Sequence, residues 1–198
     1  MGELDIQTGV TGIVLTGADA STVTVDGNGD AAVLLGAITS TNNPGPDLTV
    51  NSEGGVTMTS ANINTGTLTV AVDNGGVAGA VTGSFGSLTA VIVSIAGSAG
   101  NDTLTFTGGV AAGGSLDINT AATVNLASQT YSAVGELDIQ TGVTGIVLTG
   151  ADASTVIVDG NGDAAVLLGA ITSTNNPGPD LTVNSEGGVT MTSANINT

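Results

Sequence analysis

Oxygen-bearing side chains occur in this chain at spacings that suit a hard metal ion. The hexapeptide DGNGDA occupies residues 26–31 and again residues 159–164. Its Asp, Asn and Asp stand at alternate positions with glycine between them, so a turning backbone can aim three oxygens at one calcium ion. The predicted calcium ligands are Asp26, Asn28 and Asp30 and, in the second copy, Asp159, Asn161 and Asp163.

The order D-x-N-x-D is also the start of an EF-hand calcium loop, but the hexapeptide then departs from that motif. Ala31 and Ala164 replace the glycine, and Ala37 and Ala170 stand where the bidentate glutamate belongs. A second interpretation therefore stays open. In it, the loop is a glycine-rich corner between two strands, and its Asp and Asn side chains cap backbone N–H groups.

A seventh candidate ligand is Asp102, in the stretch GSAGNDTLT at residues 97–105. The stretch resembles the calcium-binding nonapeptide of RTX surface and secreted proteins, with Ser98 in place of its second glycine, and the resemblance implies that Asp102 is a ligand. The motif occurs only once in the sequence, whereas a β-roll needs it in tandem. The alternative is a turn that leads into a strand, TLTF.

The composition excludes most other chemistry. The chain has no Lys, Arg, His or Cys, and 17 acidic residues give it a formal charge of −17. It therefore lacks the usual general bases, thiol nucleophiles and phosphate-binding cations, and we expect no enzyme, no nucleic-acid partner and no binding to anionic membranes. There is no apolar run long enough to span a membrane and no signal peptide at the start, so no membrane insertion is expected. The carboxylates must be hydrated, screened by salt or neutralised by bound cations, which makes calcium a possible cofactor.

A short strand-like theme recurs along the chain, as in GELDIQ, PDLTVN and GTLTVA. Apolar residues alternate with Thr or Asp, which is the period of a half-buried strand. Clusters such as VDNGG and TNNPGPD separate the strands and supply turn residues. We expect the third positions of the theme to form one inward-facing column, and these are Leu4, Val23, Leu48, Leu68 and Leu88.

The sequence also repeats on a longer scale. Residues 2–65 match residues 135–198 at an offset of 133, with one difference, Thr24 against Ile157. We therefore divide the chain into a complete unit, 2–134, and the first half of the next, 135–198, and expect them to form one continuous solenoid rather than separate domains. The differing position should point outward if Val23 and Val25 point inward. We expect each unit to return to the same corner of the stack.

These patterns predict an all-β fold. The first choice is a parallel β-solenoid (β-helix) with rungs of about 20 residues, because the unit is finely self-similar and has almost no aromatic residues. The alternative is a tandem of antiparallel β-sandwich domains, in which strands also recur at regular intervals.

Stretches such as LTVNSEGGVTMTSANINTGTLTVAVDNGG, together with the long units, resemble giant bacterial surface proteins with β-strand repeats. These are similar to filamentous-haemagglutinin-like adhesins and RTX-type exoproteins. The resemblance implies an extracellular or cell-surface location and a role as a structural segment of a repetitive fibre, stalk or appendage, with other copies of itself as partners, end to end or laterally. The alternative is an adhesin repeat that binds a surface partner or glycan, although an aromatic platform for sugar is missing.

Overall fold

A computed structural model describes residues 3–17, 21–42, 45–64, 66–75, 79–98, 101–151, 154–175 and 177–196. These residues form strands and turns and contain no helix, and therefore no helix that is long and apolar enough to cross a membrane. In chain order the strands are β1 (Glu3–Ile6), β2 (Ile13–Leu15), β3 (Thr22–Gly27), β4 (Ala32–Ser40), β5 (Asp47–Ser52), β6 (Val56–Asn62), β7 (Thr67–Ala71), β8 (Thr82–Ala90), β9 (Ile92–Ala96), β10 (Thr103–Phe106), β11 (Val110–Ala112), β12 (Leu116–Asn119), β13 (Ala121–Ala127), β14 (Thr130–Ala133), β15 (Leu137–Ile139), β16 (Val143–Thr149), β17 (Thr155–Gly160), β18 (Val166–Ser173), β19 (Asp180–Ser185) and β20 (Val189–Asn195).

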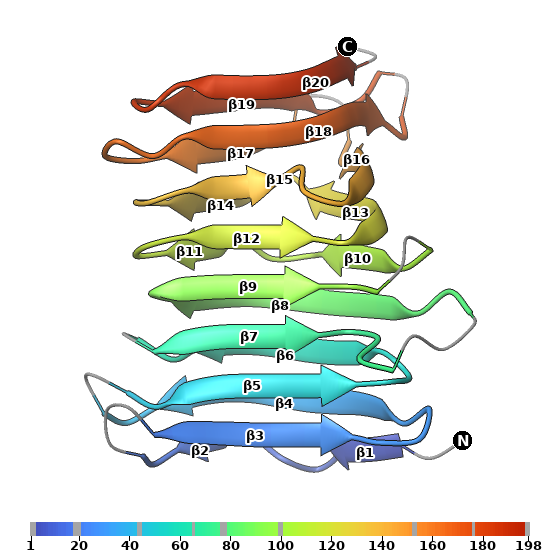
Figure 1. Ribbon diagram of the computed structural model, residues 1–198, viewed down its shortest axis with the longest axis vertical. Coiled ribbons are helices and arrows are strands. Elements are labelled where there is room, and N and C mark those ends of the chain that lie inside the picture. Colours follow the sequence, from blue (N-terminus) through green and yellow to red (C-terminus); the bar gives the residue numbers. More distant parts are fainter. Residues whose placement is uncertain are drawn as a thin grey trace.

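The strands stack as a parallel β-solenoid, as the sequence predicts (Figure 1). Each strand pairs with the strand one rung before or after it, and every pair among the described residues is parallel, as β3–β5, β5–β7 and β7–β9 show. Parallel pairing in sequence order rules out the antiparallel sandwich. The fold class expected from the strand theme is therefore confirmed.

Each rung has three sides, and strands on the same side pair along the stack to form a face. Face 1 contains β1, the first halves of β4, β6 and β8, then β10, β13, β16 and the second halves of β18 and β20. Face 2 contains β2, the second halves of β4, β6 and β8, then β11, β14, β17 and β19. Face 3 contains β3, β5, β7, β9, β12, β15 and the first halves of β18 and β20.

The predicted inward column is only partly correct. Val23, Leu48 and Leu68 do pair in sequence on face 3. Leu4 instead pairs with Val33 on face 1, and Leu88 pairs with Val110 on face 2. All three sides of a rung alternate apolar and polar residues, so the theme alone does not distinguish one face from another.

The rungs differ in length, and most are longer than the expected 20 residues. The longest interval between consecutive core positions on face 1 runs from Leu4 to Val33, and the shortest runs from Leu104 to Val124. The strands stay in register along these rungs, so the extra residues lie in the connections between strands. The full column on face 1 is Leu4, Val33, Val56, Gly83, Leu104, Val124, Ile146, Ile171 and Ala194.

Faces 1 and 2 meet at a corner that needs only one unpaired residue. In β4, β6 and β8 the register runs without a break except at Gly36, Thr59 and Gly86. A Cβ added at Gly86 would lie 1.8 Å from the carbonyl oxygen of Thr59, so this close approach requires glycine.

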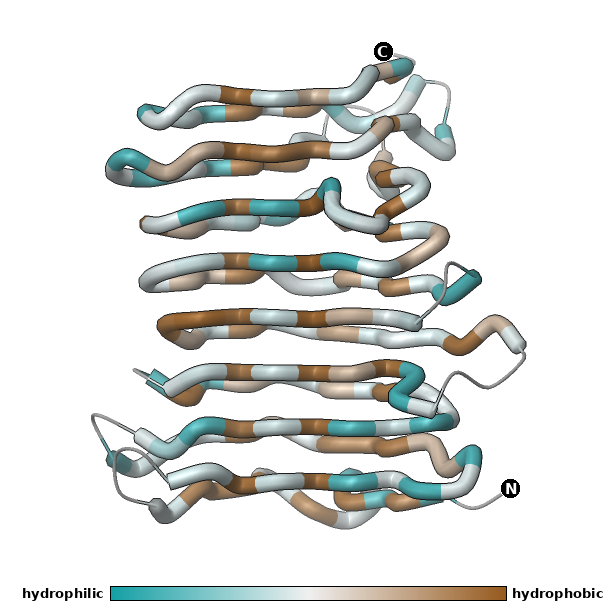
Figure 2. The backbone as a smooth tube through the Cα atoms, in the orientation of Figure 1, coloured by the Kyte–Doolittle hydropathy of each residue, from teal (hydrophilic) through white to brown (hydrophobic). Residues whose placement is uncertain are grey.

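Inward side chains fill the solenoid with aliphatic residues, and Figure 2 shows apolar positions recurring from rung to rung along the strands. The chain has two Phe and one Tyr, and all three are buried together in the middle of the stack. The rings of Phe85 and Phe106 stack with centroids 5.2 Å apart, and Tyr131 meets Phe106 edge to face at 6.2 Å. The outward position predicted for the one difference between the copies is also observed, because Thr24 is exposed.

Leu68→Asp should unfold the rungs around β7. Leu68 is fully buried between Leu48 and Val93, and its burial is worth about 1.5–3 kcal/mol before the cost of an unpaired buried charge is added. Thr69→Asp is the matched control, since Thr69 is exposed at the next position of the same strand. Urea denaturation followed by circular dichroism measures both. Equal free energies of unfolding for the two variants would contradict the inward column.

Tyr131 should not ionise while the chain is folded. Burial raises the pKa of the Tyr131 phenol, and its hydroxyl donates a hydrogen bond to the carbonyl oxygen of Ala127 at 3.1 Å. The raised pKa favours the neutral form, so its contribution to stability is complete below about pH 10 and is lost as the pH rises further. Tyr131 is the only tyrosine, so the ultraviolet absorbance of tyrosinate reports it alone.

We expect the tyrosinate signal to appear together with loss of the β-sheet circular dichroism signal, and Tyr131→Phe to delay unfolding to a higher pH. A phenol that titrates in the folded chain at the ordinary pKa of tyrosine would show that the ring is exposed to water.

Candidate functional site

The first DGNGDA loop joins β3 on face 3 to β4 on face 1. Asp26 points outward near the end of β3, and Asn28 and Asp30 lie in the turn that follows. All three side chains are exposed. Gly29 and Asp30 have positive φ angles of 70° and 59°, which shows that the glycine-rich sequence forms a tight corner here.

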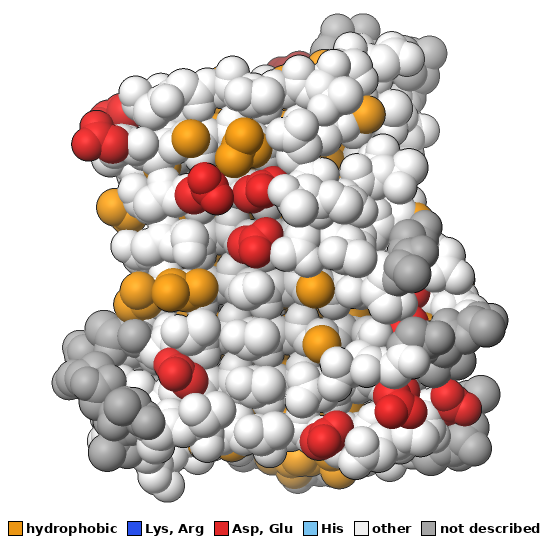
Figure 3. All heavy atoms as spheres, viewed as in Figure 1, with side chains coloured by type: hydrophobic (Ala, Val, Ile, Leu, Met, Phe, Trp, Pro, Cys, Tyr) orange, Lys and Arg blue, Asp and Glu red, His pale blue; other side chains and the backbone are white. Residues whose placement is uncertain are grey.

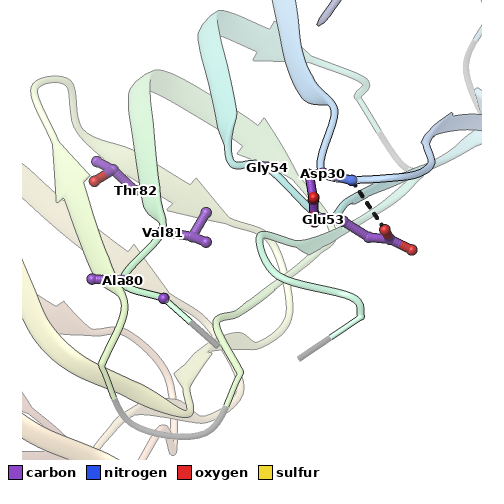
Figure 4. Close-up of a pocket in the computed structure, with 7 residues that line it drawn as sticks. Asp30, Glu53, Gly54, Ala80, Val81 and Thr82 are labelled. Atoms are coloured by element: carbon purple, nitrogen blue, oxygen red, sulfur yellow. Dashed lines mark hydrogen bonds between the residues drawn. The ribbon is translucent and has the colours of Figure 1, made fainter. Parts of the chain in front are cut away.

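Residues of the next rung hold this corner. A carboxylate oxygen of Glu53 accepts a hydrogen bond from the backbone N–H of Asp30 at 3.1 Å (Figure 4). The same oxygen accepts a second from the backbone N–H of Gly29 at 2.8 Å. The hydroxyl of buried Ser52 lies 2.8 Å from the carbonyl oxygen of Ala31. Glu53 was not among the predicted site residues, although the stretch NSEGG that contains it recurs at residues 184–188 and was a signal for it.

A shallow hollow of about 420 Å³ opens beside this corner. Its lining is Asp30, Glu53, Gly54 and residues 79–82. Asp30 and Glu53 are the only acidic residues among them, and the rest of the lining is small and neutral. The hollow therefore has the charge to attract a cation and no described cationic side chain to repel one.

The second copy shares part of this construction. Asp159 is half-buried in β17, whereas Asn161 and Asp163 are exposed in the turn after it. Gly162 has a positive φ of 62°, and Ser185 takes the place of Ser52, with its hydroxyl 2.8 Å from the carbonyl oxygen of Ala164. Both copies of the hexapeptide therefore form a corner between two strands, but its Asp and Asn side chains accept no hydrogen bond from the described backbone N–H groups; in the first copy Glu53 has that role.

The structure places Asp102 away from both hexapeptide loops, in the turn before β10. Its side chain is fully buried, and its two carboxylate oxygens accept hydrogen bonds from the N–H groups of Val81 at 3.0 Å and Ser98 at 2.7 Å. Its backbone carbonyl accepts further hydrogen bonds from Ala122 and Thr123 on the next rung. Asp102 therefore connects consecutive rungs through the backbone, and the predicted turn before the strand TLTF is confirmed.

A second buried carboxylate lies near Asp102. Asp73 is 4% exposed, and one of its oxygens accepts a hydrogen bond from the hydroxyl of Ser98, the residue whose N–H binds Asp102. Two carboxylates thus share Ser98 in the interior of a corner.

The unit boundary carries a different capping arrangement, in the repeated GELDIQT. The Asp5 carboxylate accepts hydrogen bonds from the N–H groups of Gln7 and Thr8. The Asp138 carboxylate does the same for the residues in the second copy, Gln140 and Thr141. Hydrogen bonds from Thr8 lower the pKa of Asp5. This Asp therefore has a local role at the start of each copy.

Acidic side chains are spread over the surface, and some come close together on face 3 (Figure 3). Asp117 on β12 pairs directly with Asp138 on β15. Even so, the described residues contain no group of three or more His, Cys, Asp or Glu side chains that could hold a metal ion. Calcium binding at the hexapeptides or at Asp102 stays a prediction, and backbone carbonyls or water would have to complete the coordination.

No protein-family model, curated protein or solved structure matches this chain.

Asp102→Asn should destabilise the solenoid by about 1–3 kcal/mol. An amide can accept a hydrogen bond at only one of its two ends, so the N–H of Val81 or of Ser98 loses its buried partner. Asp117→Asn is the control, because it removes a charge next to Asp138 without removing a buried acceptor. Urea midpoints compare the variants, and an unchanged midpoint for Asp102→Asn would disprove the capping role.

Calcium should raise the melting temperature. The 17 acidic residues repel one another because the chain has no cationic side chain, and any site formed only in the folded state adds stability by mass action. The measurement is a melt in chelator against millimolar calcium at matched ionic strength, with magnesium as a control for screening.

The double variant Asp30→Asn and Asp163→Asn should reduce the calcium shift if the hexapeptides bind the ion. A melting temperature that calcium leaves unchanged would remove the calcium interpretation of all the predicted ligands.

Proposed function

We propose that this chain is a structural segment of an extracellular repetitive fibre, stalk or appendage, extended by further copies of the repeat unit or by association with other copies of the chain. The observation that carries the proposal is strand pairing across the boundary between residues 134 and 135. It occurs on all three faces, through β13–β16, β14–β17 and β12–β15.

Pairing at this boundary has the same form as pairing within a unit. Buried inward side chains meet across it on each face, as Leu116 with Leu137, Val124 with Ile146 and Tyr131 with Val158 show. A new unit therefore lengthens one hydrophobic core instead of starting a separate one. This is the property that an elongated structural protein needs.

The surface supports the same role. The chain has no Lys or Arg that could form an ion pair with a carboxylate of a neighbouring molecule, so acidic rods repel one another unless cations bind between them. The absence of Lys and Arg also removes trypsin-type cleavage sites, which suits an environment with proteases. The extracellular location rests on this and on the resemblance to bacterial surface proteins.

The alternative adhesin function has less support. Sugar-binding surfaces commonly present aromatic rings, but Phe85, Phe106 and Tyr131 are all buried. Specific binding on a glycan array, or adhesion of cells to immobilised protein, would favour the adhesin over a purely structural role.

Adding one unit to the chain should lengthen the particle without widening it. The strands β1–β14 of one unit cover 17 sides, which is between five and six three-sided rungs. At about 4.8 Å per rung, one unit therefore adds roughly 27 Å. Small-angle scattering or negative-stain microscopy of chains with and without one inserted repeat unit measures this. Two separate globules joined by a linker, or a cross-section that grows with each unit, would contradict the proposal.

A further inference from the structure

The two copies of the repeated sequence lie on different faces of the solenoid. β15 repeats β1, yet β1 begins face 1 and β15 pairs with β12 on face 3. β16 repeats β2 but moves from face 2 to face 1, and β17 repeats β3 but moves from face 3 to face 2. In Figure 1, β3 and β5 lie on the near side, whereas their copies β17 and β19 lie behind β18 and β20.

The shift follows from the number of sides in one unit. The described residues of the unit form the 14 strands β1–β14, and β4, β6 and β8 each cover two sides, which gives 17 sides. A rung has three sides, so 17 sides make five rungs and two further sides. The expectation that each unit returns to the same corner is therefore wrong, because the chain repeats its sequence one side before it completes a sixth rung.

We infer that successive units of this solenoid are turned by one third of a rung, so that the array presents every surface feature of the unit on all three sides in succession. The inference deepens the proposed fibre function and rests on it for any array longer than this chain. Identical features recur about every 27 Å along the axis but face the same direction only every third unit, roughly every 80 Å.

The acidic hexapeptide loops show this display directly. The loop at 26–31 connects face 3 to face 1, and the loop at 159–164 connects face 2 to face 3, so the two copies lie at different edges (Figure 1). A third unit, turned once more, would place its loop at the remaining edge. A partner that recognises one copy therefore meets the next copy on another side of the rod. The array is therefore suited to binding separate partner molecules around its circumference, rather than one extended partner that lies along a single face.

Pairs of engineered cysteines test the rotation in the full chain, which has no cysteine of its own. Outward residues that pair between parallel strands lie about 4.8 Å apart, within the Cα range of a disulfide. Asp138→Cys should form a disulfide with Asp117→Cys, its partner on face 3. It should not form one with Asn125→Cys. Asp5 is the equivalent of Asp138 in the first copy, and it lies in the same face 1 column as Asn125. Asn125 would therefore be the partner of Asp138 only if a unit made a whole number of rungs.

A second set uses a different shared position. Val147→Cys should form a disulfide with Asn125→Cys, its partner on face 1. It should not form one with Ser132→Cys on face 2. Ser132 lies in the column of Val14, which is the equivalent of Val147 in the first copy. Thr49→Cys with Thr69→Cys, paired inside one unit, is the positive control. Circular dichroism first confirms that each variant is folded. Oxidation is then followed by thiol alkylation and mass spectrometry of dilute protein.

We expect the two predicted pairs to close at least about tenfold faster than the two alternative pairs, because only the predicted pairs lie within disulfide distance. Faster closure of Asn125→Cys with Asp138→Cys and of Ser132→Cys with Val147→Cys would overturn the rotation. Closure of the positive control alone would overturn it as well, since the boundary pairs would then be absent. These results concern the placement of the second copy, whereas particle length tests the fibre function, so the two can fail separately.

Discussion

Parallel pairing in register between rungs is the constraint on which the rest of this structure depends. It places each side chain directly against its partner one rung away, so the apolar side chains that point inward pack on one another along each face. Outward positions are mixed, as the pair of Asp138 with Leu167 shows. On face 3 the inward positions pair Leu48 with Leu68, and the outward positions pair Thr49 with Thr69. The same rule brings Asp117 against Asp138, where two like charges must be tolerated.

The lack of cationic side chains gives the backbone N–H groups an unusual role. Buried carboxylates in other proteins are commonly paired with Lys or Arg, but here the oxygens of Asp102 accept hydrogen bonds from the amides of Val81 and Ser98. Glu53 uses the amides of Gly29 and Asp30 in the same way. Acidic residues in this chain therefore serve as acceptors that fasten corners, and the corners of one rung are fastened by residues of another.

The sequence predicts the strands and their parallel arrangement well because both follow from local alternation and self-similarity. It does not predict which face a strand occupies. Leu4 and Leu88 belong to the same sequence theme as Leu68 but lie on other faces, since each side of a rung has the same apolar period. Asp102 binds the amide of Val81, and Glu53 binds the amide of Gly29, and both amides lie more than 20 residues away in the sequence, so no local motif predicts these partners. The hexapeptide corners were predictable from their glycines, but Glu53, which holds the first of them, was not among the predicted residues.

Because the rungs differ in their number of residues, the number of residues in the chain does not by itself determine the length of the solenoid. Core positions on face 1 stay in register although the intervals between them differ, as the long one from Leu4 to Val33 and the short one from Leu104 to Val124 show. An insertion at a corner thus adds mass at the edge and leaves the axial rise of that rung unchanged, and the entropic cost of closing a longer loop grows only slowly. The corner within β8 at Gly86 is an exception, because it has no space for even one extra carbon atom. Insertions in the long connections between strands are therefore tolerated, in evolution or in protein engineering, while the axial rise per rung stays the same.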